Sequence, residues 1–179
     1  LIVAAGCSTR MKQFKPLMLV NGYPMIIWAV MNLQNAGVRE ICVVVGCYAE
    51  KMQEILRPFG VTIVYNEAYQ DTDMLASVKL GLKKMVNDNT DGILLLPGDS
   101  PMINPKTIGA MIKTFQKYQA SILYPFYENK RTHPPLIGKI CFQDILRYQG
   151  DGGIRSVLFS FEETARQLLV SDYGTSIDA

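Results

Sequence analysis

The chain has 179 residues, of which 49% are hydrophobic and 19% are charged. This length and composition fit one α/β domain with a sizeable core, so a division into two domains is not expected. Lys and Arg number 18 against 16 Asp and Glu, and the signs are interspersed, which argues against nucleic-acid or membrane partners. No apolar stretch reaches the roughly 20 residues that span a bilayer, and no signal peptide is visible. A cytoplasmic protein is therefore expected.

The first residues form an apolar run that ends in a glycine and is followed by two spaced cations. Three small residues at its end, Ala4, Ala5 and Gly6, remove side-chain bulk. A polyanionic ligand could therefore approach the main chain there, with Gly6 free to adopt a positive φ. Arg10 offers a guanidinium fork for phosphate oxygens and Lys15 a compact positive charge. The alternative is a first strand, a glycine turn and solvated cations.

Two better-known phosphate motifs are absent from this loop. The P-loop pattern needs Gly-Lys-Ser/Thr where Met11-Lys12-Gln13 stands. The dinucleotide-binding pattern would need glycine at Ser8 and at Met11. Any phosphate site here must therefore be of another kind.

The cysteine pattern gives no indication of a metal or disulfide framework. Cys7, Cys42, Cys47 and Cys141 lack Cys-x-x-Cys spacing, and the chain has a single His. We therefore expect neither a zinc site nor a disulfide framework. Cys42 lies inside an apolar run and is expected to be a small core residue.

Strand and helix patterns alternate along the chain. Strands are predicted at 1–5, 41–45, 61–65, 93–96, 120–125 and 166–170. Helices are predicted from Met25 to a stop at Gly37, over 49–56, from Met74 onward, and on both sides of 150–155. The alternation predicts a Rossmann-like, doubly wound, mainly parallel sheet in three α/β/α layers, with ligands at the carboxyl ends of the strands.

Asp99 is the second strong signal, because it follows the apolar run 93–96 and a Pro-Gly turn. A carboxylate at the end of a buried strand is costly unless it meets a cation or water. Mg²⁺ takes one or two carboxylates together with substrate phosphates, so Asp99 facing Arg10 and Lys15 would complete a phosphoryl-transfer site. The alternative is an Asx turn that starts the helix around Thr107.

These motifs together resemble a known signature. Ala4-Ala5-Gly6-x-Ser8-x-Arg10-Met11, Lys15-Pro16-Leu17 and Gly98-Asp99-x-Pro101 resemble sugar-nucleotide-type nucleotidyltransferases, most closely the branch containing molybdenum cofactor cytidylyltransferase. The resemblance covers nearly the whole chain, as a single NTP-transferase domain over 1–179 with a terminal helix expected to follow. It implies the nucleotidyltransferase fold, with Ala4, Ala5, Gly6 and Ser8 among the nucleotide-binding residues. Lys12 departs from the glycine usual after the Arg-Met pair.

Ser77 belongs to a segment that resembles the one in which a serine at a helix start faces the nucleotide base. A helix N-terminus with free N–H groups and a hydroxyl can read the edge of a base. The alternative is that Ser77 caps an ordinary amphipathic helix.

Two later stretches resemble acceptor-side segments of the cytidylyltransferase branch. His133-Pro134 matches a Gly-His-Pro stretch in which Thr132 replaces the glycine, and 150–155 matches Gly-Asp-x-Gly-x-Arg. His133, Asp151 and Arg155 are therefore acceptor candidates, Arg155 for an anionic group. The alternatives are that His133 is an ordinary loop residue and that Asp151 with its neighbouring glycines only ends one helix and starts the next.

The resemblance implies transfer of a nucleotidyl group from an NTP to a small phosphorylated acceptor, with release of pyrophosphate. Arg10 and Lys15 would neutralise the phosphates, and Asp99 with Asp178, the start of an Asp-x-Asp-like finish, would hold Mg²⁺. Ala4-Ala5-Gly6, in place of an Ala-Gly-Gly version, favours CTP. The implied acceptor is a molybdopterin cofactor, with transient contact to a cofactor-receiving enzyme.

Other functions fit the same residues. Within the same enzyme class, the alternatives are GTP as the nucleotide donor and a sugar or alcohol phosphate as the acceptor. A non-catalytic nucleotide-binding regulator or cofactor-delivery chaperone could keep the same loop. A serine hydrolase is disfavoured, since neither Gly6-Cys7-Ser8-Thr9-Arg10 nor Gly98-Asp99-Ser100-Pro101 makes a Gly-x-Ser-x-Gly elbow.

Overall fold

The computed structural model describes residues 1–7 and 14–177. Two ladders share the segment 92–97, with orders β5-β4-β1-β7 and β11-β8-β10-β6. All pairs in the first ladder are parallel. In the second, β11 is parallel to β8, while β10 is antiparallel to both of its neighbours. The strands are β1 (Ile2–Ala4), β4 (Cys42–Val45), β5 (Thr62–Tyr65), β6 (Gly92–Leu94), β7 (Leu96–Pro97), β8 (Ile122–Tyr127), β10 (Leu136–Gly138) and β11 (Arg166–Leu169).

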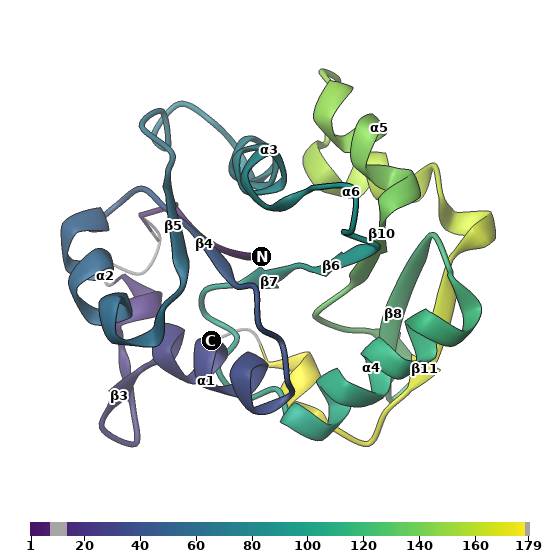
Figure 1. The fold of residues 1–179 in the computed structure, drawn as a ribbon, viewed down its shortest axis with the longest axis horizontal. Coiled ribbons are helices and arrows are strands. Elements are labelled where there is room, and N and C mark those ends of the chain that lie inside the picture. The colour runs from purple at the N-terminus through teal and green to yellow at the C-terminus, as the bar shows by residue number, and fades with distance from the viewer. Residues whose placement is uncertain (8–13, 178–179) are drawn as a thin grey trace.

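Helices cover both faces of this sheet (Figure 1). One face packs against α1 (Met25–Asn35), α2 (Ala49–Leu56) and α4 (Pro105–Tyr118). The other packs against α3 (Met74–Met85), α5 (Phe142–Arg147) and α6 (Gly153–Phe159). The three-layer, mainly parallel α/β arrangement expected from the alternation is confirmed. No helix in the described residues is long and apolar enough to cross a membrane.

The buried strand β4 shows why the layers form. Its four residues are all fully buried, and their side chains alternate between the two faces of the sheet. Val43 and Val45 join the core under α1, α2 and α4, whereas Cys42 and Val44 join the core under α3, α5 and α6. A strand that is buried on both faces requires a continuous apolar run. The prediction of Cys42 as a core residue is confirmed.

Trp28 lies at the edge of α1. It is half-buried, and its Nε1 donates a hydrogen bond of 2.7 Å to the Val20 carbonyl. Val20 belongs to the hairpin of β2 (Leu19–Val20) and β3 (Tyr23–Pro24). Trp28 therefore attaches this hairpin to α1 and lies outside both central cores.

The expectation that no cysteines pair is wrong. A disulfide joins Cys7 and Cys47, whose Cα atoms are 5.2 Å apart, across a sequence separation of 40. Cys7 follows β1 and Cys47 follows β4, and these strands are parallel neighbours with Ala4 opposite Val45. Parallel pairing therefore brings together two residues whose spacing carries no motif.

Candidate active site

The carboxyl ends of β1, β4, β5 and β7 meet at one edge of the sheet. The Gly98 N–H donates to the Val3 carbonyl at 2.9 Å, and the Cys47 N–H donates to the Ala5 carbonyl at 2.9 Å. Strand β1 lies between β4 and β7, so connections leave it in both directions. Such a topological switch point is where open α/β sheets bind ligands.

Lys15 and Asp99, from two distant motifs, meet at this edge. Lys15 Nζ lies 3.6 Å from Asp99 Oδ2, and their side chains are 22% and 25% exposed. Lys15 begins the short 3-10 helix η2 (Lys15–Leu17), whose Pro16 is buried. The ammonium offsets the cost of a partly buried carboxylate, while both groups keep access to solvent and ligand.

Gly98 sets how closely the two motifs approach. A Cβ at Gly98 would lie 2.7 Å from Ala4 Cβ and 3.4 Å from Pro16 Cγ. A side chain there would therefore separate β7 from β1 and from the Lys15 segment. The absence of a side chain lets Asp99 lie beside Lys15.

The residues around Asp99 fit a divalent metal that is bound largely by substrate phosphates. In the described part of the chain, no group of three or more His, Cys, Asp or Glu is arranged to hold an ion. Asp99 is a single accessible carboxylate, and the buried Ser100 hydroxyl beside it has no hydrogen-bond partner among described residues. Mg²⁺ commonly takes one or two carboxylates and completes its shell with water and phosphate. Asp99 could supply that carboxylate.

Part of the predicted nucleotide loop lies outside the described residues, namely Ser8 and Arg10, and so does Asp178. Ala4 and Ala5 are buried, and Gly6 is exposed at the end of β1. Gly6 does not take up the positive φ that the sequence permits. A Cβ on Gly6 would meet no described atom within 4 Å, so none of the described residues crowds the main chain at Gly6.

Ser77 is not the cap of α3. Asp73 occupies the N-cap position, and its carboxylate accepts a hydrogen bond of 3.1 Å from the Ala76 N–H. Ser77 is buried in the first turn, where its hydroxyl accepts a bond of 3.0 Å from Asn66 Nδ2. Asn66 follows β5, and its N–H donates to the Val45 carbonyl at 2.8 Å. Ser77 thus belongs to a polar network at the strand ends, and a base contact stays a prediction.

A cavity of about 720 Å³ adjoins Asp99. It is lined by Asp99, His133 and Arg155, which come from three separate stretches. Asp151 is exposed in the turn before α6 and does not line this cavity. The structure therefore brings two of the three predicted acceptor residues next to Asp99.

The histidine segment is held by the end of the described chain. The His133 N–H donates to the Thr175 carbonyl at 3.0 Å, and Thr132 Oγ1 donates to Thr175 Oγ1 at 2.9 Å. Thr132 and Thr175 are both buried. The threonine that replaces the expected glycine thus makes a specific contact, and this contact holds the backbone that carries His133.

Sequence reasoning missed three polar or aromatic residues on the cavity wall. Arg131 makes a two-pronged ion pair with Glu162, with 2.7 Å between Nη1 and Oε2, and its Cζ lies 4.7 Å from the Tyr124 ring centre. The hydrogen bonds from Arg131 lower the pKa of the Glu162 carboxyl. Arg131 stands two residues before His133, a proximity that could have suggested it; Glu162 and Tyr124 carry no comparable signal.

Apolar side chains also line this cavity. Phe159 and Met74 line it and are 74% and 48% exposed. Exposed apolar side chains beside two arginines give the cavity a mixed character, suited to a ligand with an anionic group and an apolar body. Phe159 belongs to no motif that the sequence singles out, whereas Met74 opens the predicted helical segment that contains Ser77.

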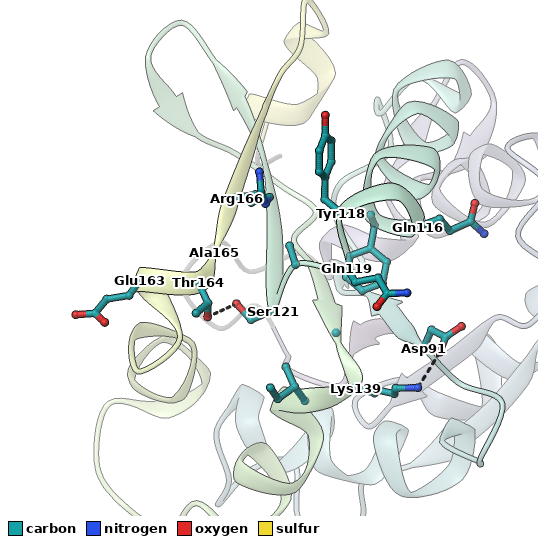
Figure 2. Close-up of a pocket in the computed structure, with 14 residues that line it drawn as sticks. Asp91, Gln116, Tyr118, Gln119, Ser121, Lys139, Glu163, Thr164, Ala165 and Arg166 are labelled. Carbon is teal, nitrogen blue, oxygen red and sulfur yellow. Dashed lines mark hydrogen bonds and ion pairs between the residues drawn. The ribbon is translucent and has the colours of Figure 1, made fainter.

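A larger cavity, of about 810 Å³, lies at the other end of the sheet (Figure 2). Its lining includes Asp91, just before β6, and Arg166, at the start of β11. Lys139 Nζ pairs with Asp91 at 3.1 Å, and Thr164 Oγ1 donates to Ser121 Oγ at 2.8 Å, as the dashed lines show. These polar groups already satisfy one another. None of the predicted site residues lines this cavity, whereas Asp99, His133 and Arg155 line the other one, so the cavity beside Asp99 is the better candidate for a reaction site.

The sequence is similar to part of several curated proteins. The bifunctional protein GlmU of Carboxydothermus hydrogenoformans is 34% identical over 115 residues, covering 63% of this chain and 24% of that protein. The chain spans about a quarter of the length of the first curated relatives it matches.

Solved structures agree with the fold. Rv0371c from Mycobacterium tuberculosis H37Rv, also solved as a manganese complex, has a TM-score of 0.81 and 24% identity over 94% of this chain and 85% of that chain. A nucleotidyl transferase from Methanothermobacter has a TM-score of 0.78 and 26% identity over 95% of this chain and 85% of that chain. The family model described as MobA-like NTP transferase domain matches residues 1–166, and the chain therefore belongs to that family.

Proposed function

We propose that the chain is a metal-dependent nucleotidyltransferase that transfers a nucleotidyl group from an NTP, CTP in preference, to a small phosphorylated acceptor. The observation that carries the proposal is the approach of Lys15 to Asp99, 3.6 Å apart, beside the cavity lined by His133 and Arg155. Two motifs about 84 residues apart in sequence meet there, at the strand ends where a member of an NTP-transferase family is expected to bind its nucleotide.

In the proposed reaction an acceptor oxygen attacks the α-phosphorus of the NTP in line, and pyrophosphate leaves. The main chain at Ala4 to Gly6 would bind the nucleotide, and Lys15 with Arg10 would neutralise its phosphates. Ser77 and Ser8 would contribute to nucleotide binding. Mg²⁺, bound by Asp99 and, in the proposal, Asp178, would supply further charge neutralisation. Most of the catalysis would then come from positioning and electrostatic stabilisation.

Arg155, with His133 beside it, would bind the acceptor's anionic group on the cavity side of Asp99. An acceptor that is already a phosphate has no need of a strong base, so His133 would orient the acceptor without removing a proton. A molybdopterin is the acceptor that the sequence resemblance favours. A sugar or alcohol phosphate, or GTP as donor, is the nearest alternative. The NTP substrate is consistent with a cytoplasmic setting.

The decisive experiment measures pyrophosphate release from each of the four NTPs with a panel of phosphorylated acceptors and Mg²⁺. Asp99→Asn should lower turnover by at least about 100-fold with the fold intact, as for the loss of one essential electrostatic group. The matched control is Asp91→Asn, which removes an exposed carboxylate at the opposite end of the sheet. Near-normal activity of Asp99→Asn would refute the assignment. Tight NTP binding without pyrophosphate release from any pair would favour the non-catalytic regulator.

A further inference from the structure

One turn, residues 46–48, attaches to both described residues that flank 8–13. Cys47 is bonded to Cys7 through the disulfide, and its N–H donates to the Ala5 carbonyl at 2.9 Å. The neighbouring Tyr48 ring packs on the Phe14 ring, with 5.2 Å between centroids. The residue before segment 8–13 is thus bonded to the β4–α2 connection, and the side chain of the residue after it packs on the same connection.

This turn is itself tightly packed. A Cβ on Gly46 would lie 2.7 Å from the Ala5 oxygen and 2.6 Å from Tyr69 Cβ, so the turn fits closely between β1 and the segment after β5. Tyr48, the N-cap residue of α2, adopts a left-handed φ of 54°. A rigid turn is a suitable anchor, because a tether restricts a segment only as far as its own attachment point is fixed.

The two bonded cysteines are accessible, unlike the other two. Cys7 and Cys47 are half-buried, whereas Cys42 and Cys141 are fully buried free thiols. Burial raises the pKa of the Cys141 thiol to about 12 and also raises that of Cys42. Thiol–disulfide exchange needs a thiolate and access to sulfur, so it is directed to the Cys7–Cys47 pair.

We propose that the Cys7–Cys47 pair is a reversible redox-modification site that controls NTP affinity, with a dithiol reductant as its co-substrate. The inference rests on the proposed function, since it assigns regulation to the same nucleotide site. Disulfides in reducing compartments are commonly transient and redox-sensing, which fits an NTP-using enzyme better than a permanent structural bond does.

The chemistry balances as a two-electron exchange. A thiolate of the reductant attacks one sulfur of the pair, the protein S–S bond breaks, and a mixed disulfide forms while the other protein sulfur leaves as a thiolate. The reductant's second thiolate then attacks the mixed disulfide and releases the remaining protein sulfur. Both protein thiolates take up protons, and the reductant becomes a cyclic disulfide. A small-molecule disulfide reverses the steps.

The oxidised form should bind NTP more tightly. The disulfide holds Cys7 directly after Gly6, where main chain is proposed to meet the nucleotide, so less conformational freedom is lost when the ligand binds. Reduction leaves Phe14 and Tyr48 in contact but removes the covalent attachment at Cys7. We expect reduction to weaken CTP binding by about three- to tenfold.

The test uses the intact chain. Alkylation and peptide mass mapping first establish the state: Cys7 and Cys47 should resist iodoacetamide in the oxidised protein and react after dithiothreitol treatment. Calorimetric titration with CTP and Mg²⁺ then compares the oxidised, reduced and reoxidised wild type, which needs no mutation. The double variant Cys7→Ser, Cys47→Ser should show the reduced-form affinity under both conditions.

The outcomes separate the inference from the function on which it rests. Equal CTP affinity in the oxidised and reduced protein, or tighter binding after reduction, would overturn the redox inference and leave the nucleotidyltransferase proposal standing. A double variant whose affinity still responds to dithiothreitol would also overturn it. Binding of none of the four NTPs in either redox state would defeat the proposed function and, with it, the inference.

Discussion

Replacing Gly98 by Ala tests whether close packing at the strand ends positions Asp99. The added Cβ would lie 2.7 Å from Ala4 Cβ, and 3.4 Å from both Ala4 Cα and Pro16 Cγ. Gly98 does not have a positive φ, so the backbone itself tolerates alanine and the effect is steric. Overpacking of this kind costs about 1–3 kcal/mol. For a domain of this size that corresponds to a decrease in Tm of about 2–12 °C.

The same change should act on catalysis through Asp99. Relief of the clash must move β7 away from β1, or displace Pro16 and with it the neighbouring Lys15. Either movement alters the 3.6 Å approach of Lys15 to Asp99. A misplacement of about 1 Å can cost on the order of 100-fold, so a loss of at least about tenfold in kcat is expected.

Two assays and one control decide the question. Thermal unfolding followed by circular dichroism gives Tm, and pyrophosphate release gives kcat. The control is Gly109→Ala in α4, where a Cβ meets no described atom within 4 Å. Helical Gly→Ala stabilises by about 0.5–1 kcal/mol, so Tm should rise by about 1–4 °C with kcat unchanged. A Gly98→Ala protein with wild-type Tm and kcat would refute the packing argument.

Three further predictions concern binding and metal. Lys15→Ala should weaken NTP binding far more than binding of the matching nucleoside. Lys15→Arg should also weaken NTP binding, because a guanidinium fork cannot replace a compact ammonium. Equal losses of affinity for both ligands in calorimetry would contradict a phosphate role. Arg155→Ala should raise the acceptor KM at nearly unchanged NTP affinity, with a loss of acceptor binding free energy of about 1.5–3 kcal/mol. An unchanged acceptor KM in steady-state kinetics would assign Arg155 a structural role. Chelation of divalent metal should abolish pyrophosphate release, and added Mg²⁺ should restore it; activity that survives exhaustive chelation would exclude the metal role of Asp99.

Local patterns were sufficient for most of the fold. The helix predicted over 49–56 has those bounds, and β4 fills all but the first residue of the strand predicted over 41–45. Burial on two faces requires an unbroken apolar run, and an amphipathic helix requires apolar residues every three or four positions, so both are readable within one segment. The meeting of Lys15 with Asp99 was also foreseeable, because parallel strands deliver their carboxyl ends to the same edge.

What the sequence left open depended on contacts between distant segments. The antiparallel β10 is only three residues long and follows two prolines, so it has too little length to show a period. The pairing of Arg131 with Glu162 joins residues that are 31 apart and belong to different elements. Side-chain periodicity says nothing about such partners, and their place on the wall of the cavity beside Asp99 became visible only in three dimensions.

The sequence by itself marked the residues of the proposed nucleotide site, whereas the tertiary structure decided how its parts are connected. Residue type and strand position marked Gly6, Lys15 and Asp99, because main-chain access, a cation and an acid are local properties. The Cys7–Cys47 bond has no local mark: its two sulfurs are joined because β1 and β4 are parallel neighbours, and register places one strand end beside the other. Cysteine spacing measures distance along the chain, and a disulfide requires distance in space.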